Sequence, residues 1–380
     1  MHSPPLWTAE QLAVLDALEL SDDPLSVESC AGSGKSTVLL ECAHRLAARH
    51  EPVRVAAFGR EATAKLKARL APLLATHRRF VEVRSIYGAG FVALDDHFGG
   101  SRESRAARMR EEQGGGPEAP PARVSIKPGQ TPAQALAATR GSAPELGWTF
   151  DADATKQRCL TVAERVTSKP AKLAESLHEI ADAAKNTLVD PTDLAGLGRV
   201  VWGLALARNE VDAARLAGLA SEVLQATLAE PRRGDYRDMG WLAVMLDVIP
   251  VFPGTVLLDE AQDLNPLEHE IVRRMCGGSG GSTQPGSAPR AGARLVQFGD
   301  PTQAIFGWNG AVPDGMRRLA TSVDAVRMQL SVSFRCPLRV TQEANVFNPS
   351  MQSDPSCGLG DVRKNVGIPQ MLREIEPGAV

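Results

Sequence analysis

The stretch Ser29-Cys30-Ala31-Gly32-Ser33-Gly34-Lys35-Ser36-Thr37 decides the fold. Just before it, Leu25-Ser26-Val27-Glu28 can form a buried strand, and just after it apolar residues recur at helical spacing. A glycine-rich loop between a strand and a helix binds phosphate, because its N–H groups turn inward and the helix dipole attracts anions. We therefore expect Lys35 to reach the β- and γ-phosphates of a nucleotide and Ser36 to bind Mg²⁺. One position departs from the usual pattern, since Ser29 stands where a glycine is common.

Composition indicates a globular protein with room for two or three domains. The chain has 380 residues, 43% hydrophobic and 23% charged, with a net charge of −3. This charge balance excludes a global basic field, so any nucleic-acid site must be a local patch or an aromatic groove. The N-terminus carries no export signal, and no apolar run reaches the ~18 residues of a membrane span. A reducing cytoplasm fits the scattered cysteines, which are Cys30, Cys42, Cys159, Cys276, Cys336 and Cys357.

The first predicted helix begins after Thr8 and carries Leu12, Leu15 and Leu18 on one face. Gln11, at its third position, has two interpretations. It can close a capping box with Thr8, or it can recognise adenine, since an amide both donates and accepts hydrogen bonds. The helix itself is predicted under either interpretation.

Strands and helices then alternate. A strand over residues 53–58, a helix over 61–70 and a strand over 80–83 lead into Ser85-Ile86-Tyr87-Gly88. This alternation predicts a parallel sheet covered on both faces. Residues 99–147 and 277–292 are rich in Gly, Pro and Ser and are predicted to be loops. Between them, residues 154–230 have helical periodicity, which indicates a helical insert in the α/β domain.

Two acids follow a second apolar run, Thr255-Val256-Leu257-Leu258. They are Asp259 and Glu260, and Gln262 and Asp263 come directly after them. The carboxyl ends of parallel strands share one edge of a sheet, so these acids should lie beside the phosphate loop. There Asp259 would hold Mg²⁺, and Glu260 would orient and deprotonate the attacking water.

Two further segments carry candidate site residues. A strand over 295–298 ends in Gly299-Asp300-Pro301-Thr302-Gln303, and Ile305-Phe306-Gly307-Trp308 follows it. Aromatic rings can stack on unpaired bases, although such a cluster is also typical of a core. Residues 330–335 are predicted to form one short strand that ends at Arg335.

Together these segments resemble the motif series of superfamily 1 DNA helicases of the UvrD/PcrA/Rep type. The likeness is closer to the branch with the F-box DNA helicases and related phage enzymes. Residues 8–11 resemble the adenine-reading Q motif, 29–37 motif I and 57–60 motif Ia. Residues 259–263 match motif II in full, 299–311 resemble motif III, and 333–335 resemble motif IV.

The resemblance implies a role for each matching residue. Gln11 and residues 29–37 would bind ATP, Gln303 would sense the γ-phosphate, and Arg335 would act as an arginine finger. Catalysis would involve Lys35, Asp259, Glu260, Gln303 and Arg335. The single-stranded DNA track would include Phe58, Arg60, Tyr87, Phe306, Trp308 and Asn309, the last of which replaces a usual arginine.

The resemblance also implies a domain plan. Residues 1–97 and 235–329 would form a RecA-like domain 1A, residues 98–234 the helical insert 1B, and 330–380 the start of domain 2A. The expected function is Mg·ATP hydrolysis coupled to single-stranded DNA, as a 3′→5′ helicase or as its ATP-binding half.

Three further expectations qualify this function. Motifs V and VI are not found, so we expect a truncated chain, a degenerate copy, or one half of a split enzyme whose second polypeptide supplies them. Alone it would bind Mg·ATP, hydrolyse it weakly and not unwind duplex. An ATP-gated DNA- or partner-binding module is the alternative, and motifs II and III argue against a small-molecule kinase.

Overall fold

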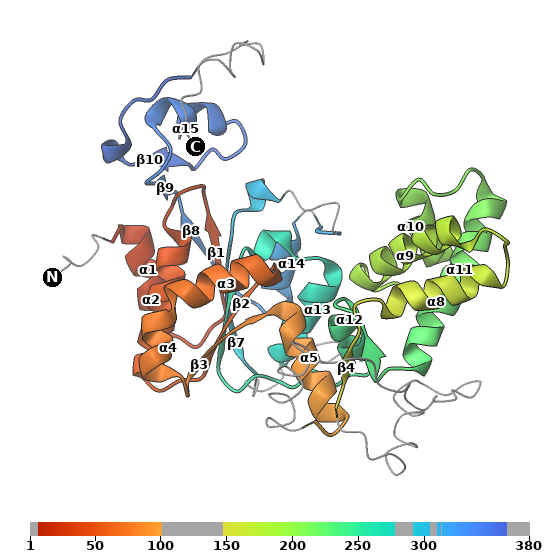
Figure 1. Ribbon diagram of the computed structural model, residues 1–380. Coiled ribbons are helices and arrows are strands. Elements are labelled where there is room, and N and C mark those ends of the chain that lie inside the picture. The colour runs from red at the N-terminus through yellow and green to blue at the C-terminus, as the bar shows by residue number, and fades with distance from the viewer. Residues whose placement is uncertain (1–6, 101–146, 278–291, 305–309, 313, 363–380) are drawn as a thin grey trace.

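The computed structural model describes residues 7–100, 147–277, 292–304, 310–312 and 314–362 (Figure 1). Most of the two predicted loops lies outside these residues. So do three of the predicted DNA contacts, Phe306, Trp308 and Asn309, and the side chain of Arg60.

A six-stranded sheet forms the centre of the molecule, and all its strands are parallel. Its order is β3-β2-β6-β7-β1-β8. The strands are β1 (Leu25–Ser29), β2 (Val53–Ala57), β3 (Val81–Ser85), β6 (Thr255–Asp259), β7 (Arg294–Gly299) and β8 (Val326–Leu330). The predicted α/β fold with a parallel sheet is thereby confirmed.

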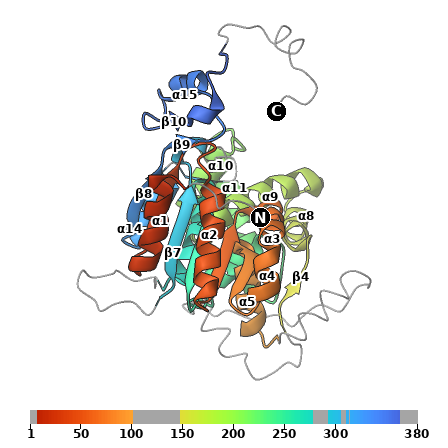
Figure 2. The same cartoon turned by 90° about the vertical axis from the view of Figure 1, so that its left-hand side faces the viewer.

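Helices cover both faces of the sheet, and each face has its own apolar core. In β6, Leu257 belongs to one core while Val256 and Leu258 belong to the other, because successive side chains of a strand point to opposite faces. Figure 2 shows the first helices over one face. They are α1 (Ala9–Leu20), α2 (Lys35–Ala48), α3 (Gly59–Arg69) and α4 (Ala71–His77). The opposite core includes side chains of α5 (Ile86–His97), α12 (Asp238–Met245), α13 (Pro266–Met275) and α14 (Gly315–Ser322).

The face of α1 that carries Leu12, Leu15 and Leu18 is buried only in part. Leu15 and Leu18 are buried, but Leu12 is 42% exposed. The buried face runs through Gln11, Val14, Leu15 and Leu18 instead. Gln11 faces the phosphate loop, which turns Leu12 toward solvent.

The helical insert stands apart from the sheet (Figure 1). It contains α8 (Ala154–Glu164), α9 (Pro170–Asn186), α10 (Leu194–Gly203) and α11 (Glu210–Ala229). Its two ends meet where β4 (Thr149–Phe150) pairs in parallel with β5 (Arg233–Gly234). Beside this pair the buried Trp148 donates from Nε1 to the carbonyl of Pro231 at 3.0 Å. Within the described residues, no helix is both long and apolar enough to cross a bilayer.

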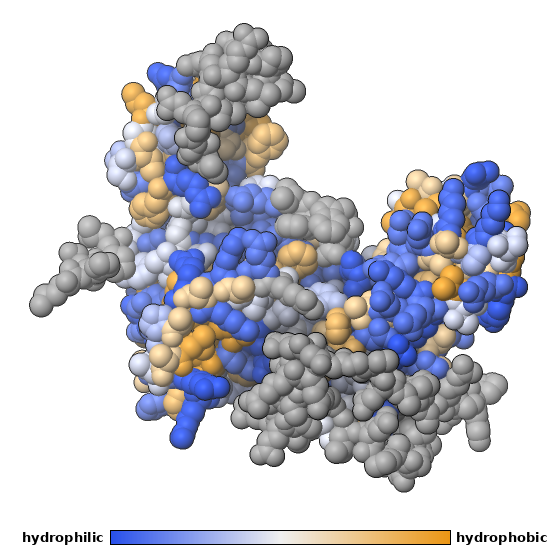
Figure 3. All heavy atoms as spheres, in the orientation of Figure 1, coloured by the Kyte–Doolittle hydropathy of each residue, from blue (hydrophilic) through white to orange (hydrophobic). Residues whose placement is uncertain are grey.

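After β8 the chain enters a small C-terminal lobe, which we define as residues 332–362 (Figure 1). The lobe contains β9 (Val332–Ser333), α15 (Leu338–Ala344), β10 (Gln352–Ser353) and a 3₁₀ turn at Pro355–Cys357. The prediction of one strand over 330–335 was wrong. Because Ser331 breaks the pairing, β8 ends in the main sheet and β9 pairs with β10. Figure 3 shows apolar side chains on the surface of this lobe. Val346, Phe347 and Leu359, which belong to the lobe, are exposed.

Candidate nucleotide and DNA sites

The phosphate loop connects β1 to α2, as the sequence predicts. Gly34 is the N-cap of α2 with φ of +78°, and Gly32 has φ of +76°. Glycine adopts this left-handed backbone without the steric cost of a Cβ atom. Within the described residues no side chain caps the N-terminus of α2. Its first N–H groups are therefore available to an anion.

Ser29, the departure from the usual pattern, forms a contact that glycine lacks. Its Oγ donates to the carbonyl of Gly299 at 2.9 Å, and the side chain is buried. Gly299 ends β7, the neighbour of β1 in the sheet. The serine thus links the start of the phosphate loop to the strand that leads to Gln303.

One buried atom in the loop supports the fit of a nucleotide. Ser33 is 2% exposed, and its Oγ has no hydrogen-bond partner among the described residues. A buried hydroxyl without a partner is costly, and a phosphate oxygen would satisfy it. Together with the uncapped helix, the loop residues fit the triphosphate of ATP.

Lys35 lies against both predicted acids. Its Nζ contacts the carboxylate of Glu260 and lies 3.4 Å from Asp259 Oδ1. Burial raises the pKa of Asp259, although the charge of Lys35 opposes this effect. Burial also acts on Glu260, but Lys35 and the amide of Gln262 outweigh it and lower the pKa of that carboxyl. Lys35 and Gln262 therefore favour the charged form of Glu260.

Glu260 is joined to the end of β7 by a chain of side-chain contacts. Gln262 donates from Nε2 to Glu260 at 2.9 Å and accepts from the N–H of Asp300 at 3.0 Å. Gln303 in turn donates to Asp300 Oδ2 at 2.7 Å. Glu260 itself has a left-handed backbone, with φ of +53°. Non-glycine residues in this conformation cost about 1–3 kcal/mol and cluster at functional sites.

A groove of about 840 Å³ runs from this acid pair along α3. Ser36, Asp259 and Glu260 line one end, so the oxygen ligands suited to Mg²⁺ face the same space. Asp263 lines it as well, and burial together with the charge of Glu260 raises its pKa to about 7.

The segment that contains Arg335 lies directly on the phosphate loop. Ser333 Oγ donates to the carbonyl of Ala31 at 2.6 Å, and the N–H of Phe334 donates to the carbonyl of Gly32 at 2.9 Å. A Cβ atom on Gly32 would come within 2.4 Å of Arg335 Cβ. The exposed Arg335 thus begins beside the loop that would hold the phosphates.

Gln11 forms the capping box with Thr8, and its amide has a second partner. Oε1 accepts from the N–H of Thr8 at 3.0 Å, while Nε2 donates to the carbonyl of Ser33 at 3.0 Å. Gln11 is therefore a support of the phosphate loop in this structure. The amide keeps one N–H donor and one oxygen lone pair that these two bonds do not use, so the adenine interpretation stays a prediction.

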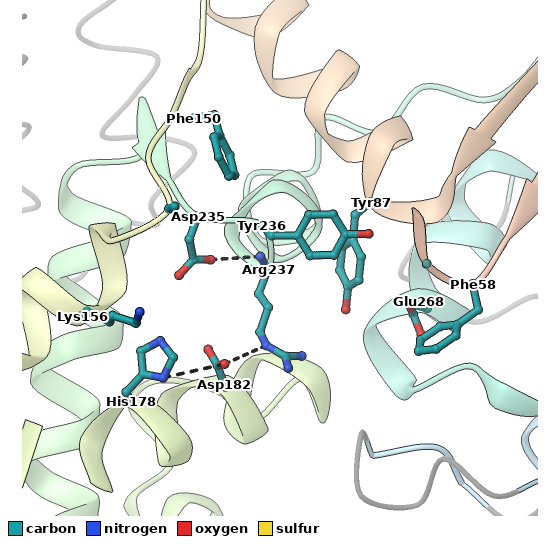
Figure 4. A pocket seen from close by; sticks show the side chains of 12 residues that line it. Phe58, Tyr87, Phe150, Lys156, His178, Asp182, Asp235, Tyr236, Arg237 and Glu268 are labelled. Atoms are coloured by element: carbon teal, nitrogen blue, oxygen red, sulfur yellow. Dashed lines mark hydrogen bonds and ion pairs between the residues drawn. The ribbon is translucent and has the colours of Figure 1, made fainter. Parts of the chain in front are cut away.

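An aromatic pocket of about 300 Å³ lies between the sheet and the helical insert (Figure 4). It is lined by Phe58, Tyr87, Tyr236 and Phe150, which come from separate parts of the chain. The Tyr87 and Tyr236 rings meet edge to face at 5.0 Å. Tyr87 is only 4% exposed, and burial raises the pKa of its hydroxyl.

Arg237 joins the pocket to the insert. It donates to Asp182 Oδ2 at 2.8 Å and to Asn186 Oδ1 at 2.7 Å, both in α9. His178, Asp182 and Asp235 offer ligand atoms within 4.8 Å of one another. Because Arg237 already pairs with Asp182, we assign no metal there.

Sequence analysis missed part of this pocket. Tyr236 was not among the predicted site residues, although it lines the pocket. Nothing in the sequence indicates that Phe150 and α9 border the pocket, because their place beside Tyr87 depends on contacts between distant segments. Of the predicted DNA contacts, Phe58 and Tyr87 line the pocket.

A phosphate loop on a parallel sheet, an acid pair on a nearby strand and a helical insert define a phosphate-loop nucleotide-binding protein. The chain matches the UvrD/REP helicase N-terminal domain over residues 7–324 and belongs to that family. It is also similar to "ATP-dependent DNA helicase Rep" of Escherichia coli (strain K12), with 28% identity over 93 residues. That segment covers 24% of this chain and 12% of the Rep chain.

Proposed function

We propose that this chain binds Mg·ATP and single-stranded DNA, and couples ATP hydrolysis to movement along DNA in the 3′→5′ direction. It would do so as an ATP-dependent DNA helicase or as its ATP-binding half. The observation that carries the proposal is the convergence of the phosphate loop, the Asp259–Glu260 pair and Gln303 at one edge of the sheet.

The ATP site follows from the donors at this edge. Residues 29–37 would hold the phosphates through backbone N–H groups, and the Ser33 hydroxyl would find its missing partner there. Ser36 and Asp259 would hold Mg²⁺, which would supply positive charge beside the phosphates. Arg335 would then stabilise charge on the transferred phosphoryl group.

Without nucleotide, Lys35 pairs with Glu260. A phosphate that attracts Lys35 would free this carboxylate, which can then accept a proton from the attacking water. The release of Glu260 would then affect Gln303 through the hydrogen bonds that join Glu260, Gln262, Asp300 and Gln303.

The DNA site would include the aromatic pocket. Phe58 and Tyr236 present rings to a space bordered by Lys156 and Arg237. Stacking on such rings needs no base sequence, and nearby cations attract the backbone phosphates. Tyr87 would support the Tyr236 ring, against which it packs. Arg60, Phe306, Trp308 and Asn309 remain predicted DNA contacts.

Tyr236→Ala is expected to weaken single-stranded DNA binding about tenfold, since one stacked base is worth about 1–3 kcal/mol. Fluorescence anisotropy of a labelled oligonucleotide measures the change. Phe80→Ala is the matched control, because Phe80 stacks on His50 just before β3, at the opposite edge of the sheet. If the wild type, Tyr236→Ala and Phe58→Ala bind the oligonucleotide with equal affinity, the pocket is not part of the DNA site.

The alternative is an ATP-gated module that binds DNA or a partner without hydrolysis. A second polypeptide that completes the ATP site stays a prediction. The exposed apolar residues of the C-terminal lobe favour a partner of some kind.

We also infer a cytoplasmic location, supported by six cysteines that form no disulfide in the described residues, which include all six.

ATP turnover, measured with and without single-stranded DNA, tests the proposal. Turnover that rises on addition of DNA supports the ATPase. Tight nucleotide binding without turnover in either condition favours the gated module.

A further inference from the structure

The first turn of α1 contacts the point where the chain leaves the main sheet. The carboxylate of Glu10 accepts from the N–H of Ser331 at 2.6 Å and from its hydroxyl at 2.7 Å. Hydrogen bonds to a charged carboxylate are short and strong. They join residues that lie 321 positions apart in the chain.

The carbonyl, the N–H and the hydroxyl of Ser331 all form hydrogen bonds. Its carbonyl accepts from Cys30 Sγ at 3.2 Å and from the N–H of Gln352 at 2.9 Å. The residue is 4% exposed and separates β8 from β9. Among the described residues, Glu10 is the partner of both its N–H and its hydroxyl, so this acid bonds to the backbone directly at the break between the two strands.

The direction of that turn decides where the next residues lie. Immediately after Ser331, β9 ends at Ser333, which bonds to the phosphate loop, and Arg335 follows. The neighbour of Glu10, Gln11, holds the same loop at Ser33. One helical turn thus contacts both the loop and the segment that covers it.

We propose that Glu10 is a positioning residue for Arg335. It holds Ser331 so that residues 332–335 leave the sheet over the phosphate loop. The hydrogen bonds of the Glu10 carboxylate go to Ser331, so its effect on the site would pass through Arg335. This inference rests on the proposed ATPase, in which Arg335 stabilises the transferred phosphoryl group.

Glu10→Ala is expected to lower kcat for ATP about tenfold and to leave ATP affinity within about twofold, as loss of a charge-assisted hydrogen bond would. In the Arg335→Ala background the same change should have little further effect, because the two residues act in series. Asp16→Ala, an exposed acid of the same helix, is the matched control.

A second readout does not depend on turnover. The rate of amide hydrogen exchange at Ser331 should rise about tenfold in Glu10→Ala. In Glu10→Gln, which keeps one acceptor, the rate should lie between those of the wild type and Glu10→Ala. Unchanged exchange at Ser331 would overturn the inference. So would kcat effects of Glu10→Ala and Arg335→Ala that multiply in the double variant. If Arg335→Ala leaves turnover intact, the proposed role of Arg335 fails instead.

Discussion

Glu260→Gln is expected to lower ATP turnover about a thousandfold, since a positioned general base contributes about 10²–10⁴ in rate. The amide keeps the size and the hydrogen-bonding geometry of the side chain but cannot accept the proton of water. ATP should bind more tightly in this variant. Glu260 contacts Lys35 without nucleotide, and the neutral amide no longer competes with phosphate for that ammonium.

Single-turnover hydrolysis and titration with a fluorescent ATP analogue measure the two effects. Glu61→Gln is the matched control, because Glu61 lines the same groove but pairs with Lys65 at 2.7 Å on its exposed wall. Turnover of Glu260→Gln close to wild type would assign the base elsewhere. It would also favour the ATP-gated module over the ATPase.

Lys185→Ala is expected to have the largest effect on stability. Lys185 in α9 and Asp238 in α12 are both fully buried, and their charged atoms lie 2.7 Å apart. Lys185 also donates to Thr155 in α8 at 2.8 Å. Removing one partner of a buried pair leaves an uncompensated charge, which costs about 3–5 kcal/mol.

Urea unfolding followed by circular dichroism measures this loss. Arg165→Ala breaks the exposed Arg165–Glu222 pair of the same insert and should cost less than about 1 kcal/mol. The double variant Lys185→Met/Asp238→Leu should recover only part of the loss, since it removes both buried charges of the pair but leaves Arg158, which lies 3.4 Å from Asp238 Oδ2, without that partner. If Lys185→Ala is as stable as Arg165→Ala, the pair does not hold the insert on the sheet.

The phosphate loop and the acid pair could be predicted because each is a short, contiguous run at the end of a strand. A parallel sheet brings all such ends to one edge, so local spacing was enough to place Lys35 beside Asp259 and Glu260. The helical insert was visible for a similar reason, since its periodicity is local.

The remaining contacts depend on residues far apart in the chain. Tyr236 contacts Tyr87 although the whole helical insert separates them in the sequence, and no spacing rule predicts this contact. Ser29 was an unexplained departure until its hydroxyl was seen to bond to Gly299. The single strand expected over 330–335 was wrong because Glu10 holds the backbone at Ser331, and this bond has no local signal.

DNA-stimulated ATP turnover tests the central claim most directly. The purified chain is assayed with Mg·ATP, with and without single-stranded oligonucleotide, and Lys35→Ala serves as the blank. The account predicts low turnover without DNA, a clear increase with single-stranded DNA, and neither in the blank. Turnover that DNA does not change, or that is still present in Lys35→Ala, would contradict the account.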